Sequence, residues 1–135
     1  MPEVAPLILL VEDDRLIRET THDLLELSGF RVLTAPSGRA AWALLERNQV
    51  DLVVTDLLMP DGDGAWLLER MNPKPGRRPI PVILLTAHAD TTPTAEETKA
   101  RADAYLVKPF DPDLLIATVR RRLERESPRP GVTIR

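Results

Sequence analysis

The sequence contains no cysteine, and this absence restricts the chemistry open to the chain. Disulfide bonds, thiolate metal ligands and thiol nucleophiles are all excluded. Aromatic residues make up only 4%, and no apolar run approaches the roughly 20 residues that span a bilayer. The first residues show no charged stretch leading into an apolar segment, as a signal peptide would. We therefore expect no membrane association and a cytoplasmic location.

A strongly basic balance is also missing. The chain has 18 Lys and Arg residues against 21 Asp and Glu residues, for a net charge of -3. Nucleic-acid-binding domains normally present a basic face, so we expect no direct nucleic-acid contact by this chain. The 135 residues suit one domain, and 43% hydrophobic residues suffice for a folded core.

The pattern that is present is an alternation of short apolar runs with longer segments of helical spacing. The apolar runs are residues 7–11, 31–35, 52–55, 82–85 and 104–107. Three of them are continuous Val, Ile and Leu, as in strands that are buried on both faces of a parallel sheet. Five β-α repeats predict a doubly wound α/β fold, with helices on both faces of the sheet.

The helical segments carry their own signals. Ser37 is a suitable N-cap for the second helix, and Asp111 followed by Pro112 suits the start of the fifth. The fourth helix, at residues 91–102, is the weakest. The apolar positions expected to face the core in the first helix are Ile17, Leu24, Leu25 and Leu27.

Polar side chains follow four of the predicted strands, at the point where each apolar run ends. They are Glu12, Asp13 and Asp14 after the first run, Asp56 after the third, Thr86 after the fourth and Lys108 after the fifth. Open α/β sheets bind ligands outside the carboxyl ends of their strands, so we expect these groups to lie close together. A carboxylate pair suits Mg²⁺, and a carboxylate can act as a nucleophile toward phosphorus. Lys108 and Mg²⁺ would offset the phosphoryl charge, and Thr86 would donate a hydrogen bond to a phosphoryl oxygen.

These segments, in their order and spacing, resemble the receiver domain of two-component response regulators, the CheY-like superfamily. The resemblance implies a five-stranded parallel sheet in the flavodoxin-like order 2-1-3-4-5. We expect the receiver domain to span residues 1–126 and residues 127–135 to be a tail or the start of a linker. So short a tail is too small for an effector domain, so we expect a chain that signals by contact or a part of a larger regulator. The quoted motifs are Leu10-Val11-Glu12-Asp13-Asp14, Asp56-Leu57-Leu58-Met59-Pro60, Asp63-Gly64, Leu85-Thr86-Ala87 and Tyr105-Leu106-Val107-Lys108-Pro109-Phe110.

The resemblance implies a role for each residue of the expected site. Asp56 corresponds to the phosphoacceptor, and the donor would be a histidine kinase or a histidine phosphotransfer protein. Asp13 corresponds to the direct Mg²⁺ ligand, with Glu12 bound through water. Asp56 itself and the backbone carbonyl of Leu58 would complete the protein ligands.

The remaining motif residues correspond to a conformational switch. Thr86 is in the place of the switch hydroxyl, Lys108 in that of the phosphate-pairing lysine and Tyr105 in that of the switch aromatic. The bond between Lys108 and Pro109 is cis in the family. Phosphorylation would then change the face made by the fourth helix, fifth strand and fifth helix, where an effector protein or a second copy would bind.

Three other functions fit the same residues less well. A Mg²⁺-dependent phosphohydrolase of the haloacid dehalogenase type needs a second Asp two residues after the nucleophile, where this chain has Leu58. A flavodoxin-like small-molecule binder is disfavoured because the three acids at residues 12–14 would repel a phosphate. A Ca²⁺ loop at residues 61–64 lacks the spaced acids and the closing Glu of an EF-hand.

Four residues depart from the family pattern or lack an obvious place in it. Leu58 stands where relatives often have a polar residue, so we expect it to leave the attacking water unoriented and the acyl phosphate long-lived. His88 is expected to be a solvated histidine rather than a group that assists hydrolysis, and His22 is expected to have no role. Trp66 is expected to pack on the proline-rich segment 72–81, with a partner contact beside the site as the alternative.

Overall fold

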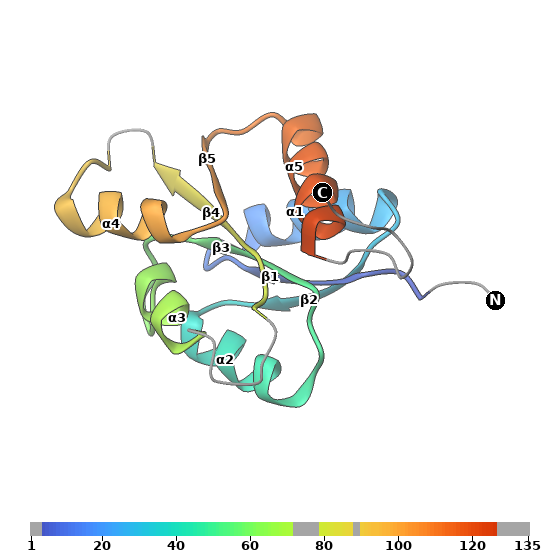
Figure 1. The fold of residues 1–135 in the computed structure, drawn as a ribbon, viewed down its shortest axis with the longest axis horizontal. Helices are drawn as coiled ribbons and strands as arrows, with labels where there is room; N and C mark the ends of the chain where they lie inside the picture. The colour runs from blue at the N-terminus through green and yellow to red at the C-terminus, as the bar shows by residue number, and fades with distance from the viewer. Residues whose placement is uncertain (1–3, 72–78, 88–89, 127–135) are drawn as a thin grey trace, which may run out of the picture.

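The chain alternates strands and helices from one end to the other. A computed structural model describes residues 4–71, 79–87 and 90–126. The elements are β1 (Leu7–Val11), α1 (Arg15–Leu27), β2 (Arg31–Ala35), α2 (Gly38–Arg47), β3 (Leu52–Asp56), α3 (Gly64–Arg70), β4 (Val82–Ala87), α4 (Pro93–Arg101), β5 (Ala104–Lys108) and α5 (Pro112–Glu126). The strands form one parallel sheet in the order β2-β1-β3-β4-β5 (Figure 1). This confirms the doubly wound fold and the strand order that the sequence implied.

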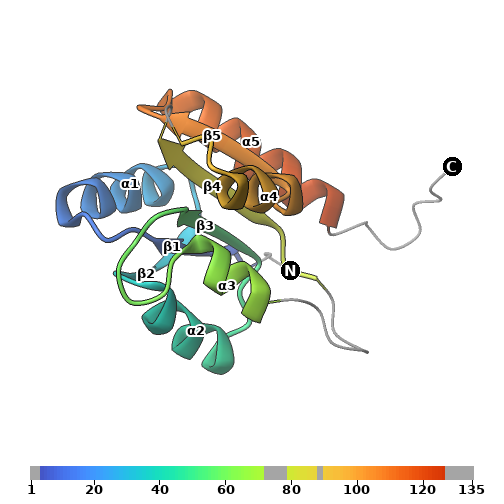
Figure 2. The same ribbon diagram turned by 90° about the vertical axis from the view of Figure 1, so that its left-hand side faces the viewer.

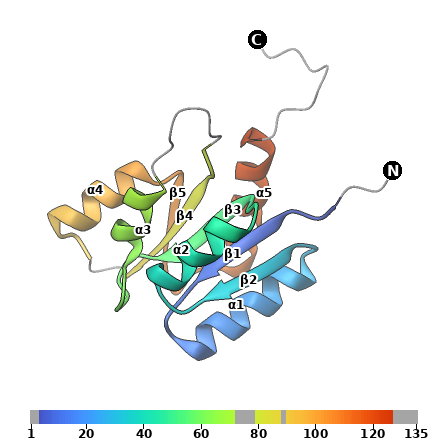
Figure 3. The same ribbon diagram turned by 90° about the horizontal axis from the view of Figure 1, so that it is seen from below.

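Both faces of the sheet are covered by helices. In Figure 2, α1 and α5 lie on one side of the sheet, and α2 and α3 lie on the other. Figure 3 shows α1 along β2 at one edge and α4 near the opposite edge. Successive side chains of a strand point to opposite faces. Ile8 and Leu10 of β1 therefore pack with α1 and α5, and Leu9 and Val11 pack with α2 and α3.

Side-chain caps fix the starts of the helices beside the sheet edge. Asp14, Ser37, Asp63 and Thr92 each accept a hydrogen bond from the backbone N–H three residues later. Asp111 accepts one from the Asp113 N–H at 2.8 Å. The caps predicted at Ser37 and Asp111 are thus confirmed. Each of these helices begins where a polar side chain replaces the missing carbonyl partner of a first-turn amide.

The structure corrects several details of the sequence prediction. Leu27 is 88% exposed, because it lies about 200° around the helix from the buried Leu25. The fourth helix is shorter than expected and starts at Pro93, after its cap at Thr92. Thr86 lies inside β4 rather than after it, because pairing with Val107 of β5 extends the strand. Among the described residues, no helix is both long enough and apolar enough to cross a bilayer.

Candidate functional site

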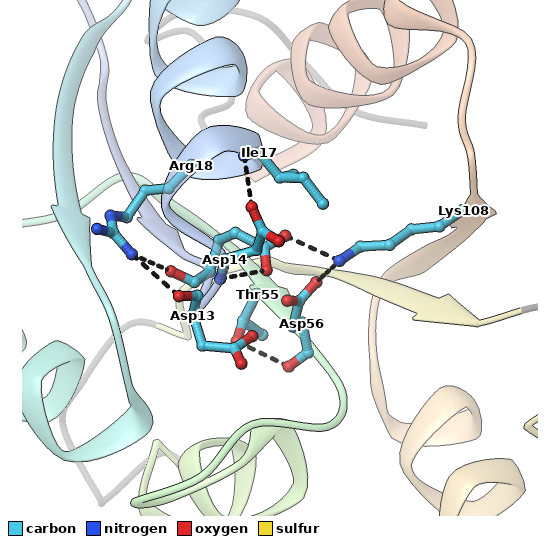
Figure 4. Close-up of polar contacts among 8 residues, drawn as sticks. Asp13, Asp14, Ile17, Arg18, Thr55, Asp56 and Lys108 are labelled. Carbon is cyan, nitrogen blue, oxygen red and sulfur yellow. Dashed lines mark hydrogen bonds and ion pairs between the residues drawn. The ribbon is translucent and has the colours of Figure 1, made fainter.

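The ends of three strands bring together the acidic and basic side chains that the sequence singled out (Figure 4). Glu12 and Asp13 follow β1, Asp56 ends β3 and Lys108 ends β5. The Lys108 Nζ lies 2.8 Å from Glu12 Oε1 and 2.6 Å from Asp56 Oδ1. Carboxylate oxygens of Glu12, Asp13 and Asp56 all lie within 4.8 Å of one another. The Lys108 ammonium therefore pairs with two carboxylates that are distant in the sequence, and the Asp13 carboxylate lies beside them.

Burial and crowding perturb the ionisation of this group. Glu12 is 1% exposed and Asp56 is 4% exposed. Burial, reinforced by the neighbouring Glu12 carboxylate, raises the pKa of Asp56 from 3.8 to about 8. Burial acts against charge on Glu12 and Lys108 too. Contacts with Asp56 and with each other outweigh it, so the pKa of Glu12 is lowered and that of Lys108 is raised. In the metal-free site, burial and mutual repulsion therefore favour uptake of a proton by the Glu12–Asp56 pair.

The donor set fits a small divalent cation. Asp56 Oδ1 is buried and has no hydrogen-bond partner among the described residues, although the Lys108 ammonium lies 2.6 Å away. Asp13 is exposed, which leaves a side of the cluster open to solvent. Oxygen-only ligands with adjacent carboxylates suit Mg²⁺, whose charge would relieve their mutual repulsion.

Two of the predicted residues do not join this cluster. Thr86 is buried on β4, one position after Leu85, the partner of Asp56 in the sheet. Its hydroxyl donates to the Ala87 carbonyl at 3.2 Å. Tyr105 is 49% exposed on β5, and the Lys99 ammonium lies 5.4 Å from the centre of its ring.

Sequence reasoning missed a residue that fixes the acidic loop. The Arg18 guanidinium donates to the backbone carbonyls of Glu12 at 2.8 Å and Asp13 at 3.4 Å (Figure 4). Arg18 lies one helical turn after the cap residue Asp14, and the Arg18 N–H donates to the Asp14 carbonyl. The only signal in the sequence was that Arg18 is one of two arginines at the start of the first helix, and such side chains are usually solvated.

The residues outside the family pattern have different outcomes. The Leu58 side chain is 64% exposed, and His22 pairs with Asp23 and Glu26 on α1. Trp66 lies on α3 and is half-buried, packed against the core cluster that includes Ala41 and Leu67. The segment 72–81, on which Trp66 is expected to pack, lies largely outside the described residues. His88 lies outside them too.

Comparison with known proteins decides the family. A family model for the response regulator receiver domain matches residues 8–120. The chain belongs to this receiver family. It is 37% identical over 118 residues to the transcriptional regulatory protein CseB of Streptomyces avermitilis, covering 87% of this chain and 49% of that protein. It is 38% identical over 120 residues to the response regulator Rre1 of Synechocystis, covering 88% and 52% respectively.

The receiver domain also matches solved structures over most of its length. A receiver domain protein (CheY-like) from Methanospirillum hungatei aligns with a TM-score of 0.80 and 29% identity, covering 91% of this chain and 97% of that one. The chain spans about half the length of the curated relatives it matches. The family and fold predicted from the sequence are thus confirmed. The Lys108–Pro109 bond is cis, as the family resemblance implied.

Proposed function

We propose that this receiver domain accepts a phosphoryl group on Asp56 from a histidine kinase or a histidine phosphotransfer protein. The observation that carries the proposal is the convergence of Asp56, Lys108 and two further carboxylates at one edge of the sheet. A cytoplasmic location is part of the same proposal. Family membership concerns the receiver domain alone and implies no particular output.

The reaction follows from the positions of the side chains. A carboxylate oxygen of Asp56 attacks phosphorus, and the bond from phosphorus to the donor histidine nitrogen breaks. The electron pair of that bond returns to the imidazole ring. Lys108, now 2.6 Å from Asp56 Oδ1, would pair with a phosphoryl oxygen. Thr86 would exchange its bond to the Ala87 carbonyl for one to the phosphoryl group.

Mg²⁺ is the cation that this site would hold. Its ligands would be the Asp13 and Asp56 carboxylates, the Leu58 backbone carbonyl and, through water, Glu12. When bound, Mg²⁺ would neutralise charge on the phosphoryl oxygens and on the crowded carboxylates. The apolar Leu58 side chain also favours a receiver over a phosphohydrolase, because it cannot serve as a general acid.

The signalling surface would be the face formed by α4, β5 and α5. Tyr105 and Val107 of β5 and Leu114 of α5 are large hydrophobic side chains that are 49%, 37% and 51% exposed. Inward movement of Thr86 on phosphorylation would open space for the Tyr105 ring and change this face. A second copy or an effector protein would then bind it, as a population shift driven by one local charge.

The test is chemical phosphorylation followed by intact mass. Incubation with acetyl phosphate and Mg²⁺ should add one phosphoryl group to the wild type and none to Asp56→Ala. Asp23→Ala, which removes an exposed carboxylate from α1, is the matched control and should be labelled normally. A wild type that gains no phosphate, or an Asp56→Ala variant that is labelled equally, would overturn the proposal.

A further inference from the structure

The loop between β3 and α3, residues 57–63, is fixed at both of its ends. At its start, the Leu57 N–H donates to the Leu85 carbonyl at 2.9 Å, and the Leu57 carbonyl accepts from the Gly64 N–H at 2.8 Å. At its far end, Asp61 has a φ of 60° and Gly62 a φ of 91°. Within the part of the chain that the structure describes, Asp61 is the only non-glycine residue with a positive φ. Surrounding contacts must therefore hold this turn.

Those contacts come from the first turn of α2. The Gly38 N–H donates to the Gly62 carbonyl at 2.7 Å, and the Arg39 N–H donates to the Asp61 carbonyl at 3.2 Å. Amides in the first turn of a helix have no carbonyl partner within the helix. The two carbonyls of the 61–62 turn satisfy these amides, so the start of α2 and the turn fix each other.

The side chains of α2 hold Asp61 in the same position. Ser37 Oγ donates to Asp61 Oδ2 at 3.3 Å, and Arg39 Nε lies 3.2 Å from Asp61 Oδ1. Both carboxylate oxygens are therefore engaged beside the positive end of the helix dipole. The Arg39–Asp61 pair is exposed, so its energy is small and its main effect is to orient the turn.

Close packing excludes other positions of the turn. A Cβ added at Gly38 would lie 2.5 Å from the Gly62 carbonyl oxygen, which is too close for any carbon atom. The Trp66 ring closes another side, since a Cβ at Gly62 would lie 3.1 Å from its Cε3 atom. The Arg39 guanidinium lies over this ring, 5.2 Å from its centre.

We propose that Ser37, Gly38 and Arg39 are positioning residues that hold the β3–α3 loop in the conformation that binds Mg²⁺. This inference rests on the proposed function, in which the Leu58 carbonyl is a metal ligand. Leu58 lies three positions before Asp61, so a displaced turn would move that carbonyl relative to Asp56. None of the three residues touches the acidic cluster, so each would act through the loop alone.

Two substitutions test this from independent directions. Gly38→Ala displaces the turn by its methyl group, although alanine at a helical position normally favours the helix. Arg39→Ala removes the side-chain contact with Asp61 and leaves the backbone hydrogen bonds. Arg39→Lys is the conservative variant, and Arg47→Ala removes the same charge from the other end of α2. Titration of the metal-free proteins with MgCl₂ by calorimetry gives affinity, and urea unfolding gives stability.

We expect Gly38→Ala to bind Mg²⁺ about tenfold more weakly, the usual size of an effect transmitted through an outer shell. Arg39→Ala should bind it roughly two- to fivefold more weakly, because an exposed ion pair contributes less. Arg39→Lys should recover much of the loss, and Arg47→Ala should match the wild type. Wild-type affinity in both Gly38→Ala and Arg39→Ala would overturn this inference and leave the proposed function intact. If Gly38→Ala fails to fold, Arg39→Ala with its lysine rescue decides alone. A wild type that binds no Mg²⁺ would overturn the metal site and this inference together.

Discussion

At Asp56, burial and a neighbouring carboxylate act on the same proton. The folded chain holds a proton there up to about pH 8, whereas the ordinary pKa is 3.8. Between these two values the unfolded state has released the proton and the folded state has kept it. Rising pH therefore favours the unfolded state, and the stability of the metal-free protein falls through this window.

Asp56→Asn removes this titrating group and should abolish its contribution to the pH dependence. We expect the variant to be more stable than the wild type by about 2 kcal/mol at the upper end of the window, a typical single-residue effect. The difference should shrink toward the lower end, where Asp56 becomes neutral in the unfolded state as well. Urea unfolding in EDTA across the window measures both proteins. A constant difference between them would contradict the expected titration.

Leu58 tests the lifetime of the acyl phosphate. Its exposed apolar side chain offers no hydrogen bond to a water molecule that approaches Asp56. We expect Leu58→Asn to shorten the lifetime roughly tenfold, less than a positioned general base contributes. Decay is measured by intact mass after removal of the phosphodonor. Leu58→Ala is the control, and equal acceleration in both variants would point to steric access rather than to polarity.

Helix α4 contributes no residue to the two large hydrophobic clusters of the core. Only Ala95 and Thr98 of its nine residues are buried, and its start depends on the Thr92 cap. Its amides should therefore exchange with solvent by local opening, faster than those of β1 and β3. Thr92→Ala should lower the free energy of that opening by about 1 kcal/mol. Hydrogen exchange measures this, with α1 as the internal reference, and equal protection of α4 and β3 would contradict it.

The helices and strands also differ in how well local sequence signals predict their boundaries. Continuous apolar runs predict buried parallel strands, and Asp111-Pro112 predicts a helix start, because both signals are local. The extension of β4 to Ala87 depends on pairing with β5, which no local signal reveals.

The residues in and around the site also differ in how well the sequence predicts them. Glu12, Asp13, Asp56 and Lys108 are predictable because strand ends share one edge of the sheet. The contacts of Arg18 and of Asp61 are not, because they depend on how a helix and a loop meet in space.

For the whole molecule, the net charge of -3 is a sum over the chain and conceals a local cluster of charged side chains. The charges of the candidate site lie in one cluster, where Lys108 pairs with Glu12 and Asp56 and the Asp13 carboxylate lies beside them. A cation that binds this cluster only in the folded state must stabilise the entire fold, because unfolding disperses its ligands over the chain.

Thermal unfolding with and without MgCl₂ therefore tests the site at the scale of the molecule. At a concentration about a hundredfold above the dissociation constant, binding contributes about 2.7 kcal/mol, which should raise Tm by roughly 5–10 °C. Asp13→Asn removes an exposed ligand without disturbing the core, so its Tm should respond little to Mg²⁺. NaCl at matched ionic strength should also have little effect on the wild type, because specific coordination differs from charge screening. An equal rise in Asp13→Asn, or in NaCl alone, would mean that Mg²⁺ acts on the general surface charge and not at the carboxyl edge of the sheet.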